Sequence, residues 1–355
     1  MKILHVVESF FGGVYDFIKD FTEITPEYQH TILYGKRKGL KNNFKNDFKE
    51  NADFILWKNA KREISLKNDF LALKELVTLL KKEKFDVIHL HSSKAGFLGR
   101  VAARVYKQQN KVIYTTHGIS FSRKDVSNRK LQLYSLLEKI GSLCGGKTIA
   151  CSKSEAEFIQ SKGIKCGYIN NGIKIEDNFL KKEKNILNIV TAARITEAKN
   201  PALFNKIAEN FIENKNIEFI WIGDGELKEQ LSSKNIKITG WLDQKEVQKQ
   251  LARADIYLST SSWEGLPIGV LQGMKNKLPI VLSNCNGNKD LVIENYNGFL
   301  FKTRVEAIGK IKFLIKDKEK IKKLGENSYL LLKKEFDIQG MIKKYKTLYK
   351  QLGEK

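Results

Sequence analysis

The chain has 355 residues, 42% of them hydrophobic, and a formal net charge of +23 from 63 Lys and Arg against 40 Asp and Glu. This length and composition suit a globular protein of two domains and exclude a disordered chain. No apolar run approaches the roughly 20 residues of a membrane span, and the first residues lack a signal-peptide layout. We therefore expect a cytoplasmic protein.

The basic excess is spread along the chain and marks no basic tail. Two interpretations fit it: a compositional bias toward lysine on solvated faces, or attraction to an anionic membrane or a polyanionic substrate. No helix-turn-helix, zinc finger or RNA-binding aromatic pattern accompanies it, so we expect no nucleic acid partner. The four cysteines show no paired spacing, which predicts reduced thiols and no zinc site.

The chain begins with a predicted apolar strand at 2–7, the glycine pair Gly12-Gly13 and a helix at 14–22. Such a glycine pair lets the backbone approach a phosphate closely. The pattern lacks G-x-G-x-x-G, which argues against a dinucleotide site. Further strands are expected at 29–34, 53–57, 86–90, 111–115, 148–151 and 167–169, with helices at 69–84, from the turn at 91–96 to about 107, at 126–144 and at 152–161.

Two turns of this first half carry candidate side chains at the ends of predicted strands. Ser92, Ser93 and Lys94 follow the strand at 86–90, where they either cap the next helix or face a ligand. His117 follows the strand at 111–115 and precedes Gly118, at the carboxyl edge of the expected sheet. A lone histidine at such a place is either structural or ligand-binding.

The polar stretch 174–185 is interpreted as a linker, after which strand and helix alternate again. Strands are expected at 187–192, 217–223, 236–239, 255–259, 279–282 and 297–301, and helices up to 252 after an Asp243 cap, at 268–274, within 304–335 and at 338–352. Arg194 and Lys199, five residues apart, lie at a strand end and just before a helix. They are either two surface cations of a lysine-rich chain or a pair that closes on one diphosphate.

A carboxylate is expected in the turn between the strand at 255–259 and the helix at 268–274. Gly265 and Pro267 end the strand region, and Pro267 suits the start of a helix because its missing N–H is not needed there. Glu264 is thereby left beside the backbone N–H groups of the next residues. Gln272, eight positions later, can face the same side of the helix.

The segment EGLPIGVLQGM at 264–274 resembles the E-x7-E motif of retaining glycosyltransferases of family 4, with Gln272 in place of the second Glu. The similarity extends to T-H-G at 116–118, N-G-I at 171–173, the R-x4-K pair at 194–199, G-D-G at 223–225, G-W-L at 240–242 and N-G-F-L at 297–300. The chain departs from the family at Lys174, where an Asp is usual, and in the loop 284–290, where a G-G-x-x-E turn is usual.

The resemblance implies an α/β protein of the GT-B fold, with two Rossmann-like α/β/α domains facing across a cleft. Residues 1–177 would bind the acceptor and residues 178–337 the nucleotide sugar. The helix at 338–355 would pack back on the first domain. In that family Arg194 and Lys199 would neutralise the diphosphate, and Glu264 would hold sugar hydroxyls with the N–H groups of 265–268. The other implied donor-side residues are Gly12, Gly13, His117, Gly223, Trp241, Leu242, Gly265, Leu266, Pro267, Ile268 and Gln272, and the acceptor-side residues are Ser92, Ser93 and Lys94.

The implied activity is transfer of a sugar, with retention, from a nucleotide sugar to a glycan acceptor. UDP is the favoured nucleotide, and the acceptor would be linked to a polyprenyl diphosphate at the anionic inner face of the cell membrane. No D-x-D triplet occurs, so we expect no metal cofactor. Two alternatives remain: a GT-B-fold nucleotide-sugar epimerase, and a non-catalytic, membrane-associated partner subunit.

Overall fold

The computed structural model describes residues 1–37, 39–61, 63–175 and 186–353. Within these limits the chain divides into two compact units, each described here by itself. The first comprises 1–122, 126–169 and the chain from Met341 onward, and the second comprises 123–125 and 170–340. The predicted boundary at 177/178 and residues 176–185 of the predicted linker lie outside the described residues.

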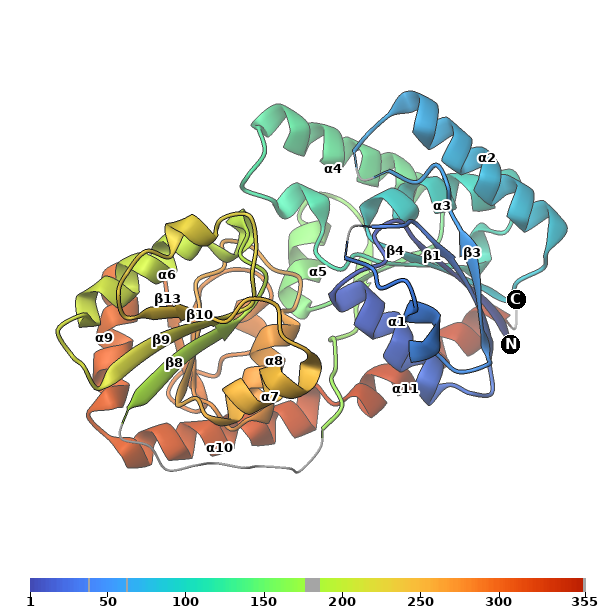
Figure 1. The fold of residues 1–355 in the computed structure, drawn as a ribbon. Coiled ribbons are helices and arrows are strands. Elements are labelled where there is room, and N and C mark those ends of the chain that lie inside the picture. Colours follow the sequence, from blue (N-terminus) through green and yellow to red (C-terminus); the bar gives the residue numbers. More distant parts are fainter. Residues whose placement is uncertain (38, 62, 176–185, 354–355) are drawn as a thin grey trace. The chain divides into compact units, whose positions relative to one another are not determined.

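The described part of the first unit contains a parallel sheet with the strand order β3-β2-β1-β4-β5-β6-β7 (Figure 1). Its strands are β1 (Lys2–Val7), β2 (Gln29–Tyr34), β3 (Ala52–Leu56), β4 (Val87–His91), β5 (Val112–Thr115), β6 (Lys147–Ala150) and β7 (Cys166–Tyr168). Its helices are α1 (Gly13–Ile24), α2 (Leu66–Lys82), α3 (Ser93–Val105), α4 (Asn128–Leu143), α5 (Lys153–Gln160) and most of α11 (Ile338–Gly353).

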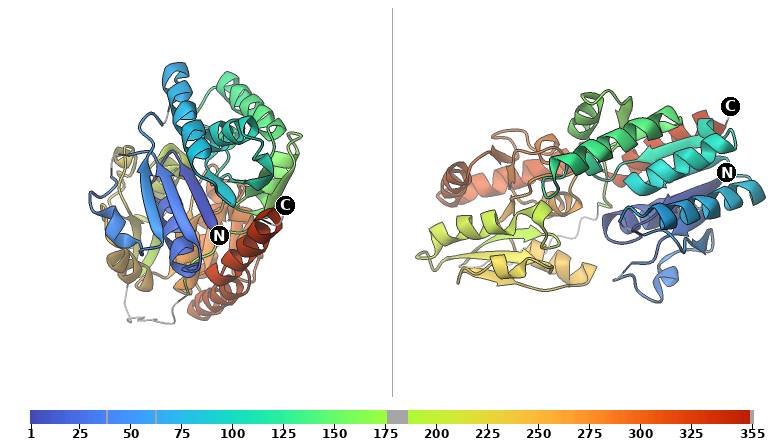
Figure 2. Two further views of the ribbon diagram at one scale, coloured as in Figure 1. Left: turned by 90° about the vertical axis from the view of Figure 1, so that its right-hand side faces the viewer. Right: turned by 90° about the horizontal axis from the view of Figure 1, so that it is seen from above.

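The two faces of this sheet have different chemistry because side chains alternate along each strand. Leu4, Val6 and Leu90 join the apolar cluster that α2 and α3 complete on one face. His5 and His89 point to the opposite face, which α1 and α11 cover (Figure 2). One face is therefore a hydrophobic core, and the other holds buried polar rings.

The described part of the second unit contains another parallel sheet, with the order β10-β9-β8-β11-β12-β13. Its strands are β8 (Leu187–Ala192), β9 (Ile217–Ile222), β10 (Ile236–Ile238), β11 (Ile256–Ser259), β12 (Ile280–Ser283) and β13 (Gly298–Phe301). Its helices are α6 (Pro201–Ala208), α7 (Gln244–Ala252), α8 (Ile268–Lys275), α9 (Arg304–Ile315) and α10 (Lys318–Glu335). Apolar side chains from α6, α9 and the strands form its core.

The strands and helices predicted from the sequence are all present, with their ends displaced by no more than three residues. The region 304–335 forms two helices, and short 3-10 turns appear where only loops were expected. Helix α11 begins in the second unit and joins the first from Met341. Among the described helices, none combines the length and the apolar character that a bilayer crossing requires.

Candidate functional site

The carboxyl edge of the second sheet brings together turns that are distant in sequence. Strand β8 lies between β9 and β11, so the turn after β8 has the turns after both neighbours beside it. The N–H of Ser262, after β11, donates to the carbonyl of Ala198, after β8, at 2.8 Å. In parallel α/β sheets ligands bind at this edge, near the amino ends of helices.

Lys199 and Glu264 meet at this edge as an ion pair between Nζ and Oε1. Ser261 also donates its hydroxyl to Glu264 Oε1 at 2.6 Å, and Thr260 donates its hydroxyl to the Lys199 carbonyl at 2.8 Å. The side chains of Lys199 and Glu264 are 24% and 11% exposed, so solvent reaches both charges. The pair lines a small pocket, partly open to solvent, together with Pro267.

Arg194 lies on the same turn as Lys199 but has a different partner. Its Nη2 forms an ion pair at 3.0 Å with Oε2 of Glu226, after β9, and the two side chains are 48% and 57% exposed. Exposed pairs of this kind contribute little to stability and exchange partners readily. The structure thus places both predicted cations at one sheet edge, each beside a carboxylate that an anionic ligand can replace.

Two glycines allow the turn after β9 to lie directly on the turn after β8. A Cβ at Gly223, whose φ is +138°, would lie 2.3 Å from the Ala193 carbonyl oxygen, and one at Gly225 would lie 2.2 Å from that of Ile195. Both distances are far below contact, so only glycine fits. The predicted G-D-G motif therefore sets the position of Glu226 opposite Arg194.

Trp241 follows β10 and offers a large exposed ring near Gly223. The backbone of Gly223 pairs with that of Gly240, and the Gly223 N–H donates to the Thr239 hydroxyl at 3.2 Å. Trp241 is 61% exposed, and Leu242 beside it is half-buried. An exposed aromatic ring at this edge is suited to stack on a flat ligand.

Helix α8 begins after Pro267, which occupies the N-cap position without a side-chain hydrogen bond. Leu266 is buried, and its carbonyl accepts from Asn171 Nδ2 at 3.3 Å, so only the backbone of this residue can reach a ligand. Gln272, on α8, has its side-chain partner on a neighbouring helix. Its Oε1 accepts from Gln248 Nε2 of α7 at 2.6 Å.

The loop 284–290 lies against Glu264 although its sequence departs from the resembled family. A Cβ at Gly287 would lie 2.6 Å from the Gly265 carbonyl oxygen and 3.0 Å from the Glu264 Cβ. Asn288 is fully buried, and its Nδ2 donates to the Ser283 carbonyl at 3.0 Å, while its Oδ1 has no hydrogen-bond partner among the described residues. Sequence reasoning missed Asn288, since nothing in the local pattern marks it.

In the first unit, the Gly12-Gly13 pair follows β1 and opens α1. Gly12 has φ of +62° and is the N-cap of the helix, and both glycines are exposed. Within the described part of the chain, no atom lies within 4 Å of a Cβ built on Gly12, so the left-handed φ, and not crowding, favours glycine there. The exposed backbone of this glycine pair is accessible to a ligand, but the structure does not identify which ligand would bind there.

The three acceptor-side candidates follow β4, and two of them, Ser93 and Lys94, contact side chains of the same unit. Ser92 is the N-cap of α3, with φ of +69° and no side-chain cap hydrogen bond, so the predicted capping bond is not formed. The Ser93 hydroxyl lies 3.3 Å from the Tyr114 hydroxyl. Lys94 Nζ forms an ion pair with Asp69 Oδ1 at 2.7 Å, and its side chain is 12% exposed.

His117 lies just beyond β5 in the left-handed region, with φ of +49°. The buried carboxylate of Glu155 holds this turn by accepting from the N–H of Ile119 at 2.7 Å and from that of Cys151 at 2.9 Å. Burial raises the pKa of Glu155, and these donors oppose the rise. Sequence reasoning missed Glu155, although the S-x-x-E spacing from Ser152 is typical of a helix start.

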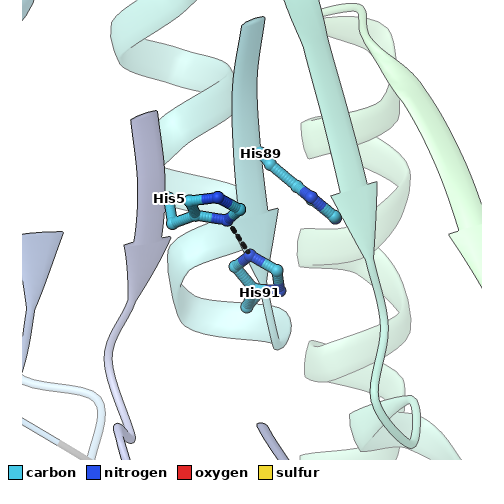
Figure 3. Close-up of side chains that lie close together, drawn as sticks. All are labelled: His5, His89 and His91. Atoms are coloured by element: carbon cyan, nitrogen blue, oxygen red, sulfur yellow. Dashed lines mark hydrogen bonds between the residues drawn. The ribbon is translucent and has the colours of Figure 1, made fainter. Parts of the chain in front are cut away.

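All five histidines of the chain lie close together on the face of the sheet beneath α1 and α11, and Figure 3 shows three of them, His5, His89 and His91. His30 Nδ1 is 3.1 Å from His5 Nε2, and His5 Nδ1 is 3.0 Å from His91 Nε2. His91 Nδ1 is in turn 3.0 Å from His117 Nε2. Four imidazoles thus form a row in which each link joins Nδ1 of one ring to Nε2 of the next.

The hydrogen bonds at one end fix the direction of this row. His30 Nε2 lies 3.4 Å from the Thr25 carbonyl, which only accepts, and 3.0 Å from the Thr25 hydroxyl, which already donates to the Phe21 carbonyl. His30 Nε2 must therefore carry the proton. Its Nδ1 then accepts from His5, and the same reasoning makes Nε2 the protonated nitrogen of His5, His91 and His117.

Burial keeps these rings neutral. Desolvation lowers the pKa of His30 to about 4 and that of His117 to about 3, and it lowers the pKa of His5, His89 and His91 well below the usual value. A general base works best with a pKa near the operating pH, so His117 is poorly suited to proton transfer. Contact with a ligand, by its ring or backbone, remains the prediction for this residue.

The same rings include the group of metal-binding side chains found among the described residues. His5, His89 and His91 bring ligand nitrogens within 4.8 Å of one another. His89, however, bonds the Tyr349 hydroxyl at 2.6 Å through Nδ1 and the Thr115 hydroxyl at 2.7 Å through Nε2. Since His5 and His91 also use both nitrogens in the row, the cluster is a satisfied hydrogen-bond network and does not fit a metal ion.

Comparison with known proteins identifies the family. A family model described as glycosyl transferases group 1 matches residues 173–331, and one described as glycosyltransferase family 4 matches residues 29–177. An Escherichia coli protein named UDP-Gal:alpha-D-GlcNAc-diphosphoundecaprenol alpha-1,3-galactosyltransferase is 30% identical over 317 residues, which cover 81% of each chain. The Staphylococcus aureus capsular polysaccharide biosynthesis glycosyltransferase CapM is 25% identical over 320 residues, or 81% of this chain and 83% of the relative.

Solved structures agree on the fold. The crystal structure of Anabaena Alr3699/HepE in complex with UDP superposes with a TM-score of 0.81, covering 98% of this chain and 99% of that chain at 17% identity. A sucrose-phosphate synthase from Thermosynechococcus elongatus also gives a TM-score of 0.81, at 15% identity and 99% coverage of both chains. With two parallel-sheet α/β units of the GT-B type and matches along both halves, the chain belongs to the glycosyl transferases of group 1, glycosyltransferase family 4.

Proposed function

We propose that this protein transfers a hexose or N-acetylhexosamine from a UDP-sugar to a glycan acceptor linked to a polyprenyl diphosphate, in the synthesis of a surface polysaccharide. The observation that carries the proposal is the pair Lys199 and Glu264, opposite charges in one solvent-reachable pocket, with Arg194 on the same turn. The relative from Escherichia coli, named for UDP-Gal and a diphosphoundecaprenol-linked GlcNAc, supports both substrate classes.

The donor would exchange partners with the two ion pairs. A diphosphate has more charge than either carboxylate, so it would draw Lys199 from Glu264 and Arg194 from Glu226. Glu264, released from Lys199, would then accept hydrogen bonds from sugar hydroxyls. The backbone N–H groups of Gly265, Leu266 and Ile268, at the start of α8, would donate to the same ligand, as unpaired N–H groups of a first helical turn do.

The rest of the donor would lie along the same sheet edge. Trp241 and Leu242 would receive the base, and Gly223 would allow the backbone to approach it. Gln272 would bond the ribose, with its carbonyl oriented by Gln248. These roles rest on the position of the residues at one edge and on the family resemblance.

We propose that no divalent metal is required, because Arg194 and Lys199 supply the charge that stabilises the leaving diphosphate. Transfer would retain the configuration of the sugar, with the leaving phosphate accepting the proton of the acceptor hydroxyl. Glu264 would then orient the sugar and not act as a base. The first unit would bind the acceptor with Ser92, Ser93 and Lys94. Gly12, Gly13 and His117 of that unit would contact the donor, as the family resemblance implies.

The direct test incubates the protein with UDP-galactose, UDP-glucose or UDP-GlcNAc and a synthetic GlcNAc-diphospho-lipid, followed by mass spectrometry of the lipid. We expect the lipid to gain the mass of one sugar with one of these donors. Proton NMR of the product gives the configuration of the new linkage. Absence of any product with all three donors and with GDP- and ADP-sugars would contradict the proposal, and an altered UDP-sugar in reactions without lipid would indicate the epimerase alternative.

A further inference from the structure

Helix α4 of the first unit presents a row of apolar side chains to solvent. Leu133, Leu136, Ile140 and Leu143 are 44%, 53%, 41% and 83% exposed. Their spacing of three, four and three residues places them on one side of the helix. This outward stripe of α4 is a continuous apolar strip along the helix, unlike the scattered single side chains usual on a protein surface.

The inner side of α4 is fixed by buried polar contacts, so the helix cannot turn to hide the stripe. Glu138 accepts from Arg100 Nη2 of α3 at 2.8 Å and from the Tyr114 hydroxyl at 2.9 Å. Gly141 lies so close to this group that a Cβ there would be 2.8 Å from Arg100 Nη2. Rotating α4 would expose this network and leave a charged pair incomplete, which costs several kcal/mol when one partner is lost.

The exposed charges on α4 itself are of one sign. Arg129, Lys130 and Lys139 are exposed on α4, with Arg129 and Lys139 on the same side of the helix as the apolar side chains. Between residues 127 and 147 the single acidic residue is Glu138, which is buried and paired with Arg100. The outer surface of α4 is therefore apolar along its centre and basic at its margins.

We propose that the outward stripe of α4 docks the first unit on an anionic lipid bilayer, with its leucines and isoleucine at the boundary between headgroups and acyl chains and its basic side chains at the headgroup phosphates. This combination of an apolar strip with flanking Lys and Arg is the composition of helices that lie in a membrane interface. The inference rests on the proposed function, because a polyprenyl-linked acceptor requires the enzyme to work at such a surface.

Other occupants fit the surface less well. Two copies joined through their α4 helices by a two-fold axis would bring like-charged margins face to face. A soluble polyanion would satisfy Arg129, Lys130 and Lys139 but would leave four apolar side chains in water. A bilayer of anionic lipid satisfies both components.

The test is co-sedimentation of the full chain with vesicles of phosphatidylcholine alone or mixed with phosphatidylglycerol. We expect binding to the mixed vesicles only, decreasing with salt. The combined variant Leu136→Ser and Leu143→Ser should bind at least about tenfold more weakly. The combined variant Arg129→Gln, Lys130→Gln and Lys139→Gln should lose on the order of 100-fold, since each basic side chain at an anionic surface contributes about fivefold.

Matched controls lie on helices of the second unit. Val305→Ser with Leu330→Ser removes two apolar side chains that are 73% and 55% exposed, and Lys312→Gln, Lys316→Gln and Lys322→Gln removes three exposed charges. Both controls should bind vesicles as the wild type does. Equal loss in the controls, or full binding by the α4 variants, would overturn the proposal, as would a dimer in solution that Leu136→Ser and Leu143→Ser dissociates.

The docking surface and the proposed function fail in different ways. With a short-chain, water-soluble acceptor diphosphate, the α4 variants should transfer sugar at the wild-type rate, and with acceptor in mixed vesicles they should be slow. Vesicle binding through α4 without any sugar transfer would refute the proposed function and leave the docking surface standing. Transfer to vesicle-borne acceptor that the α4 variants perform normally would refute the docking surface alone.

Discussion

The two sheets share the same strand topology, but their polar side chains differ in place and in chemistry. In the second unit the carboxyl edge of the sheet carries charged side chains in ion pairs that solvent reaches, Lys199 with Glu264 and Arg194 with Glu226. In the first unit the main polar feature is a row of neutral imidazoles, which runs across one face of the sheet from His30 to His117 and in which neighbouring rings bond each other. The first arrangement can exchange its partners for a ligand, and the second is built to stay as it is.

The difference suggests a division of labour in which charge recognition belongs to the second unit. The buried imidazole row is neutral, and its hydrogen bonds hold the turn at His117 in one position. Because all five histidines of the chain lie in the first unit, the two units should also differ in their response to acid. The predictions below test this contrast, from the largest expected effect to the smallest.

Acid should destabilise the first unit before the second. The folded histidines have pKa values far below 6.5, so as pH falls below 6.5 the unfolded chain takes up protons that the folded chain does not. Stability is therefore full above pH 6.5 and is lost as pH falls, by about 1 kcal/mol per histidine down to about pH 5.5, or roughly 5 kcal/mol for five. Amide hydrogen exchange in β1 and β4, compared with that in β8 and β11, measures this loss of stability in each unit.

Carboxylates contribute to acid sensitivity in both units, which makes the second sheet the internal control. Opening free energies should fall in β1 and β4 at pH values where those of β8 and β11 hold. Parallel losses in the two sheets would show that the imidazole row does not set the acid response.

Removing either cation of the second unit should reduce turnover strongly. Arg194→Ala and Lys199→Ala each remove one preorganised charge from the diphosphate, at about 3 kcal/mol in the transition state or about 100-fold in kcat/KM. Lys249→Ala, which removes another paired lysine of the same unit, is the matched control and should change little. Near-normal turnover in both site variants would remove the diphosphate assignment.

Removing the exposed ring after β10 should have a smaller effect, confined to donor binding. Trp241→Ala deletes the platform proposed for the base, which stacking data place at about 1–3 kcal/mol, or about tenfold in KM for the donor. Trp241→Phe should recover most of this loss. An unchanged KM in Trp241→Ala would place the base elsewhere.

Chelation should have no effect. If Arg194 and Lys199 carry the diphosphate charge, initial rates in EDTA should equal those in magnesium. Activity that disappears with EDTA and returns with magnesium or manganese would show that Arg194 and Lys199 do not suffice and that the second unit also requires a metal ion.

The sequence alone determined the order and nature of the elements. Runs such as Ile256–Ser259 and helical periods such as that of α2 are local patterns, and turn residues such as Pro267 and Asp243 mark helix starts through their own backbone chemistry. The residues placed at the edge of the second sheet were also predictable, because strand ends of a parallel sheet share one edge. These features could be predicted because each depends on the side chains and backbone of a few neighbouring residues.

Tertiary structure alone decided which distant side chains meet. The row His30, His5, His91 and His117 comes from three strands and the turn after β5, and only the order of β2, β1, β4 and β5 lines these rings up. The partners of Lys199 and Arg194 likewise depend on which strands lie beside β8. Helix α4 is apolar on both sides, so its periodicity does not tell which side is inside. The side that carries Glu138 faces inward. Glu138 bonds Arg100 there, and turning this side outward would separate a buried charged pair, which is strongly destabilising.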